Sequence, residues 1–116
     1  PPGSLTMTIE EGFARTIRRP VSLDVSAETL GNPGVNVLAT PCLADLCDEA
    51  ARVVCSEEKT GKLRVDIRHL AATAIGDEVE IAAEIVQVDD RKIVCRISGR
   101  DSHRAMVKGV VERRRL

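Results

Sequence analysis

Four residues carry side chains whose types could do chemistry: Thr40, Asp48, His69 and Arg113. A carboxylate with an imidazole is the minimum for activating water or attacking an acyl carbon, because one group must accept a proton and another must return it to the leaving group. Thr40 lies where a helix is expected to begin, and backbone N–H groups at a helix start can hold a developing oxyanion. The four residues form no contiguous motif, so each also fits an ordinary role as a cap, a solvated charge or a hydrogen-bonded structural residue.

One amphipathic helix is expected to position Thr40 and Asp48. Thr40 fits as the N-cap, with Pro41 at the first helical position. Asp48 projects beside the apolar stripe, on a flank of small residues that leaves room for a ligand. The stripe recurs at three- and four-residue steps and ends near Cys55; it consists of Leu43, Leu46, Cys47, Ala50, Ala51 and Val54.

Strands in which every second residue is apolar are expected to position His69 and Arg113. Leu63, Val65 and Ile67 alternate with charged residues, and His69 shares their buried parity. Further strands are predicted from Glu78 to Val88, from Lys92 to Gly99 with Ile93, Cys95 and Ile97 on one side, and from Ala105 to Arg113. In the last of these, Val107, Gly109 and Val111 share parity with Arg113. Turns are predicted at 89–90 and 101–104.

The N-terminal third is less regular. A weak strand is predicted from Thr6 to Ile17, with Gly12 as a bulge, and residues 18–36 are interpreted as a long connection and a candidate lid. Residues 1–4 resemble a remnant of tag removal, which leaves 5–116 as a single domain. One helix followed by four consecutive antiparallel strands predicts an α+β fold, and a homodimer that extends the sheet would cover an open edge.

Composition excludes several classes of function. The chain has 116 residues, a net charge of -1, one Phe, and no Tyr or Trp, which disfavours nucleic-acid binding and base-stacking platforms. It contains no apolar run long enough to span a membrane and no signal-peptide pattern, so a cytoplasmic location without membrane contact is expected. The four cysteines are expected to be reduced packing residues with no metal bound, although Cys42 near the helix start is a minority candidate nucleophile.

Three segments together resemble the hotdog-fold thioesterases of the fluoroacetyl-CoA thioesterase type. They are Val37-Leu38-Ala39-Thr40-Pro41, the run V-D-I-R-H-L-A-A-T at residues 65–73 followed by Gly76, and Gly109-Val110-Val111-Glu112-Arg113. The resemblance implies a homodimer, or a higher homo-oligomer, in which a curved antiparallel sheet wraps a central helix. It also implies hydrolysis of acyl-CoA thioesters at sites between subunits, with coenzyme A present only as part of the substrate and no cofactor.

The same resemblance assigns site residues. Thr40 matches the family's active-site threonine, His69 its catalytic histidine, and Asp48 stands where the family has a glutamate. Arg113 matches an arginine on the substrate side, and Lys62 stands where a substrate-contacting glycine is expected. Lys62 would narrow the acyl site or favour an acyl chain with a negative charge, and the family's aromatic lid residues are absent, so fluoroacetyl selectivity is not expected.

The sequence therefore predicts hydrolysis of a small or medium acyl-CoA thioester. Asp48 is expected to act as nucleophile or as general base, His69 to support proton transfer, and Thr40 to orient the acyl carbonyl or the carboxylate. Lys62 and Arg113 are expected to bind substrate. The alternatives are a non-catalytic protein that binds acyl-CoA or an acyl ligand, and a purely structural dimer.

Overall fold

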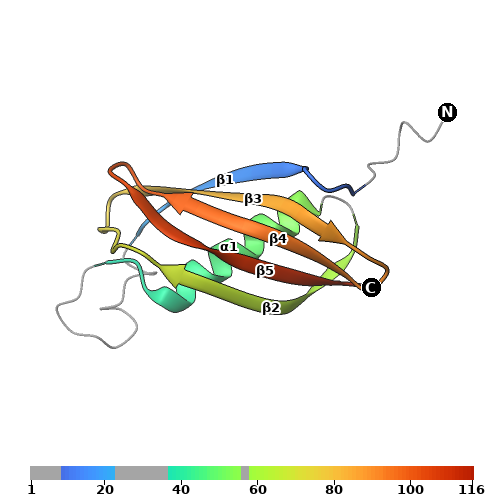
Figure 1. Cartoon of the computed structure of the whole chain (residues 1–116). Coiled ribbons are helices and arrows are strands. Elements are labelled where there is room, and N and C mark those ends of the chain that lie inside the picture. The colour runs from blue at the N-terminus through green and yellow to red at the C-terminus, as the bar shows by residue number, and fades with distance from the viewer. Residues whose placement is uncertain (1–8, 23–36, 56–57) are drawn as a thin grey trace.

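A computed structural model describes residues 9–22, 37–55 and 58–116, and shows one helix lying against one face of a five-stranded antiparallel sheet (Figure 1). The predicted α+β fold is confirmed. The elements in chain order are β1 (Ala14–Pro20), α1 (Thr40–Val54), β2 (Thr60–His69), β3 (Glu78–Val88), β4 (Lys92–Arg100) and β5 (Ala105–Arg115).

The order of strands in the sheet is β1-β3-β4-β5-β2. The last three strands form the expected meander, but β2 pairs antiparallel with β5 and lies at an edge, so the prediction of four strands paired in chain order is wrong for β2. The connection of residues 70–77 crosses from β2 at one edge to β3 near the other (Figure 1). This crossover places the half-buried residues of β2 on the same side of the sheet as the buried faces of β3, β4 and β5, where α1 covers them.

The core between α1 and the sheet is aliphatic. Small residues on α1 bring the helix backbone close to the sheet, and of the predicted stripe only Leu46 remains half-buried. No helix within the described residues combines the length and apolar character needed to cross a membrane. The buried residues that face each other are Leu43, Cys47, Ala50, Ala51 and Val54 on α1, and Val79, Ile81, Ala83, Ile85, Ile93, Cys95, Ile97, Val107 and Val111 on the strands.

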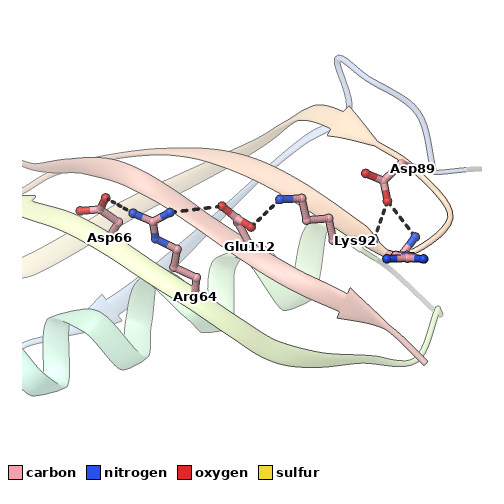
Figure 2. Close-up of polar contacts among 6 residues, drawn as sticks. Arg64, Asp66, Asp89, Lys92 and Glu112 are labelled. Carbon is pink, nitrogen blue, oxygen red and sulfur yellow. Dashed lines mark hydrogen bonds and ion pairs between the residues drawn. The ribbon is translucent and has the colours of Figure 1, made fainter.

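The opposite face of the sheet is polar and carries a row of ion pairs (Figure 2). Arg64 on β2 lies 3.1 Å from Asp66 and 3.9 Å from Glu112, whose carboxylate accepts a 2.9 Å hydrogen bond from Lys92. These charges keep the outer face hydrated, so the single helix has to cover only the inner face.

The N-terminal strand differs from its prediction. β1 covers Ala14–Pro20 and includes residues expected in the connection, because pairing with β3 continues as far as Pro20 opposite Glu78. Proline is tolerated there because β1 is an edge strand. Gly12 lies in a turn before β1 with φ +94°, not in a bulge. Residues 6–8 of the predicted strand and residues 23–36 of the candidate lid lie outside the described part of the chain.

A β-bulge in β2 changes which side chains face α1. The pairing register shifts between Lys62 and Arg64, so that Leu63 has no partner on β5 and is 41% exposed. The prediction that Leu63 is buried is therefore wrong, because an inserted residue reverses the alternation. The same shift places Lys62 opposite Arg113, on the side of the helix.

Gly109 on β5 provides a test of how closely β5 approaches β2. A Cβ atom at this position would meet the backbone oxygen of Asp66 and lie 2.6 Å from Cα of Ile67, so Gly109→Ala should lower the free energy of unfolding by about 2 kcal/mol. Gly61→Ala is the matched control, because its Cβ would meet only Cδ2 of Leu116 at 3.8 Å. Chemical denaturation followed by far-UV circular dichroism measures both, and equal stability of the two variants would contradict the close approach of β5 and β2.

Candidate active site

Thr40 is the first residue of α1, and its side chain does not cap the helix. The N-cap position is occupied by Ala39, with φ -74° and ψ 142°, and no side chain caps the helix there. The prediction of Thr40 as N-cap is wrong by one residue, because Pro41 fits equally well at the second helical position. The Thr40 hydroxyl instead lies 3.3 Å from Nδ1 of His69.

His69 ends β2 and points to the helix side of the sheet, as its parity predicted. The residue is half-buried, with Nδ1 facing the Thr40 hydroxyl. Nε2 is buried and has no hydrogen-bond partner among the described residues. A hydroxyl beside an imidazole can pass its proton to the ring or be oriented by it, which is the basic unit of acyl-transfer sites. We call these two residues the Thr–His pair.

Asp48 lies further along α1 and is held by Arg113 of β5. Nη1 of Arg113 donates to both carboxylate oxygens, at 2.9 and 2.8 Å. The other nitrogens of Arg113 donate to Thr60 at the start of β2, Nε to the hydroxyl at 3.1 Å and Nη2 to the carbonyl at 3.0 Å. The two charged side chains are only 14% and 6% exposed. Asp48, Arg113 and Thr60 form what we call the Asp–Arg cluster.

Asp48, beside which the sequence predicted room for a ligand, has both carboxylate oxygens bound by Arg113. Removing one member of a buried ion pair leaves the other charge uncompensated, at a cost of about 3–5 kcal/mol. Arg113 therefore ties α1 to β5 and β2. Thr60 was missed by sequence reasoning, because nothing in its local pattern marks it as a partner of a distant arginine.

The structure does not bring the Thr–His pair and the Asp–Arg cluster together within one chain. Thr40 and Asp48 are separated by eight residues of helix, which is about 12 Å along its axis. His69 and Lys62 are seven residues apart on β2, or about 23 Å along the strand. One chain thus carries two separate groups of polar residues between α1 and β2.

Lys62 lies beside the Asp–Arg cluster on the helix side of β2. Its Nζ is 3.6 Å from Oδ1 of Asp45 on α1, and the two side chains are 55% and 75% exposed. An ion pair this exposed contributes less than about 1 kcal/mol. Lys62 can therefore exchange Asp45 for another anion at little cost.

Three buried cysteines, Cys47, Cys55 and Cys95, lie near these groups. Burial raises the pKa of the Cys47 thiol to about 12, and the neighbouring Asp48 charge adds to this. The thiols of Cys55 and Cys95 form a hydrogen bond, which with burial raises the pKa of Cys95 and which lowers the pKa of Cys55. Cys42 is half-buried. Among the residues that the structure describes, no three His, Cys, Asp or Glu side chains gather as a metal site.

Solved structures share this fold. A hypothetical protein of Thermus thermophilus, described as a thioesterase superfamily member, is 22% identical, with a TM-score of 0.84 over 94% of this chain and 85% of that chain. A hot-dog-like protein of Thermanaerovibrio acidaminovorans is 17% identical, with a TM-score of 0.83 over 93% and 84% of the two chains. A variant of the fluoroacetyl-CoA thioesterase FlK in complex with fluoroacetate and CoA is 24% identical, with a TM-score of 0.82 over 92% and 94%. The chain thus has the hotdog fold.

Comparison with curated proteins found no match. The family model of the fluoroacetyl-CoA-specific thioesterase FlK matches residues 21–116, which include α1 and the strands β2 to β5. The matched range contains Thr40, Asp48, His69, Lys62 and Arg113. The chain therefore belongs to the FlK family of fluoroacetyl-CoA-specific thioesterases.

Proposed function

We propose that this protein hydrolyses acyl-CoA thioesters with a small or medium acyl group. The observation that carries the proposal is the 3.3 Å contact between the Thr40 hydroxyl and Nδ1 of His69 at the N-terminus of α1. Membership of the FlK family supports thioester chemistry, and the FlK variant solved with fluoroacetate and CoA supports a CoA ester as substrate.

The Thr–His pair would hold the reacting end of the thioester. The partial positive charge at the N-terminus of α1 polarises the acyl carbonyl and stabilises the tetrahedral oxyanion. Thr40 orients the carbonyl through its hydroxyl. His69 supports proton transfer to the CoA thiolate when the carbon–sulfur bond breaks.

Asp48 supplies the carboxylate that the Thr–His pair lacks. As a general base it removes a proton from water, whose oxygen bonds to the acyl carbon. As a nucleophile it forms an acyl anhydride that water then hydrolyses. Arg113 contacts Asp48 and Thr60 with all three of its nitrogens, so we assign it to positioning this carboxylate.

A homodimer would join the two groups into one site. β2 is an edge strand, and no strand among the described residues pairs with its outer side; an exposed edge favours pairing with another strand. Antiparallel pairing of two β2 strands about a two-fold axis sets the start of one strand beside the end of the other. Thr40 and His69 of one copy would then face Asp48, Arg113 and Lys62 of the second copy.

The second candidate function is acyl-CoA binding without turnover. The observation that favours it is the engagement of both Asp48 oxygens by Nη1 of Arg113 in a nearly buried ion pair, which a catalytic role would have to disturb. A rise in the melting temperature of the protein on addition of acyl-CoA, without release of free CoA thiol, would identify a binding protein that does not turn over its ligand.

The purified protein should release free CoA thiol from a panel of short- and medium-chain acyl-CoA esters. Thr40→Ala and His69→Ala should each lower kcat/KM by about a hundredfold or more, because each removes a group that acts on the reacting atoms. Melting curves with and without each ester provide the control for folding and binding. Absence of thiol release across the panel, or full activity in both variants, would contradict the proposed function.

Mixing two inactive variants tests whether the site spans two copies. Asp48→Asn and His69→Ala should each be nearly inactive alone. Exchange of subunits at equal concentrations should restore up to about a quarter of the wild-type activity, because half of the dimers are mixed and each has one intact site. Both variants are first checked for cooperative melting. Mixtures that stay as inactive as their components, after confirmed subunit exchange, would place the whole site in one chain.

A further inference from the structure

Thr73 and Asp101 are buried polar residues outside both groups described above. Thr73 lies in the connection between β2 and β3 and is fully buried, and Asp101, which follows β4, is 5% exposed. The Thr73 hydroxyl donates a 2.9 Å hydrogen bond to Oδ2 of Asp101. Polar groups this deeply buried are costly unless they are paired, so loss of either partner would leave the other buried without this bond.

The two hairpin turns of the meander show that turn formation alone does not need Thr73. In the turn between β3 and β4, one oxygen of Asp89 accepts from the backbone nitrogens of Arg91 and Lys92 (Figure 2). In the turn between β4 and β5, Oδ1 of Asp101 accepts in the same way from His103 and Arg104, at 2.8 and 2.9 Å. Asp89 is exposed, whereas Asp101 is buried and uses its second oxygen to bind another segment.

Thr73 connects the segments that carry the Thr–His pair. It lies four residues after His69, and its carbonyl accepts a 2.9 Å hydrogen bond from the backbone nitrogen of Leu38, two residues before Thr40. Its neighbour Ala74 forms an antiparallel bridge with Val37. The end of β2 and the start of α1 are thus held together through Thr73, which is itself held by Asp101.

We propose that Asp101 and Thr73 are positioning residues for the Thr–His pair. The inference rests on the proposed function for its effect on turnover. Thr40 and His69 come from segments 29 residues apart, and their contact is long and exposed, so it cannot fix their relative position by itself. The buried hydrogen bond between Thr73 and Asp101 fixes their relative position, because Thr73 is bonded to the segment that leads into Thr40 and follows His69 by four residues.

The Asp101 carboxylate is suited to this role. Burial raises the pKa of this carboxyl. Hydrogen bonds from the backbone nitrogens of His103 and Arg104 and from the Thr73 hydroxyl lower it by more than burial raises it, so the pKa lies below its ordinary value. At neutral pH the carboxylate is therefore ionised and accepts all three hydrogen bonds.

The test compares two replacements of Thr73. Thr73→Val keeps the shape and removes the hydroxyl, and Thr73→Ser keeps the hydroxyl. Thr73→Val should lower kcat by about ten- to a hundredfold with KM changed less than about twofold, because displacement of reacting groups by about 1 Å has effects of this size. Thr73→Ser should restore most of kcat. Asp101→Ser, whose hydroxyl can still serve the turn but is too short to reach Thr73, should repeat the loss.

A second readout does not depend on turnover. The chain has two histidines, so the imidazole nitrogen resonances of His69 can be assigned by comparison with His103→Gln. Thr73→Val and Asp101→Ser should shift the His69 resonances at a temperature well below melting, whereas Asp89→Ala, the matched turn variant, should leave both kcat and these resonances unchanged.

Unchanged kcat and unchanged His69 resonances in the folded Thr73→Val and Asp101→Ser variants would overturn the inference. Equal changes in Asp89→Ala would overturn it too, because they would show a general effect of turn stability. If the wild-type protein releases no thiol, the proposed function fails, while the resonance comparison still decides whether Thr73 and Asp101 position His69.

Discussion

The buried ion pair between Asp48 and Arg113 sets the position of α1 on the sheet. Contacts among Val, Ile, Leu, Ala and Cys side chains stabilise the core but are not directional, whereas a hydrogen-bonded ion pair fixes which groups meet. Arg113 binds Asp48 on α1 and Thr60 on β2 from its place on β5. Because both charges are nearly buried, any displacement of α1 would leave one of them unpaired. This ion pair holds α1 at Asp48, and the backbone bond from Leu38 to Thr73 holds the segment just before Thr40.

The fold and the sidedness of the site residues could be predicted from residue periodicity. Alternation along β2 and β5 placed His69 and Arg113 on the helix side, because side-chain direction alternates along a strand where no bulge intervenes, as between Val65 and His69. The edge position of β2 could not be predicted, since no local pattern states which strand it pairs with. The bulge at Leu63 could not be predicted either, because an unpaired residue can be identified only when the residues of the partner strand are known.

The candidate site residues were chosen from the sequence, and their grouping came from the structure. Thr40, His69, Asp48 and Arg113 were candidates from the sequence, and the structure pairs Thr40 with His69 and Asp48 with Arg113. Which of these residues pair depends on how α1 lies along β2, and only the tertiary structure shows that. Thr73 lies within the segment V-D-I-R-H-L-A-A-T but was not singled out, because its bond to Asp101 depends on the crossover of residues 70–77.

The two sets of ion pairs respond differently to ionic strength. Arg64 and Asp66 on the outer face are 62% and 66% exposed, so dissolved ions screen their attraction, with a screening length of about 8 Å at physiological salt. Arg113 and Asp48 are only 6% and 14% exposed, so their attraction is screened much less. Added salt therefore weakens the exposed ion pair more than the ion pair that holds α1, and the position of the helix depends little on the ionic composition of the surroundings.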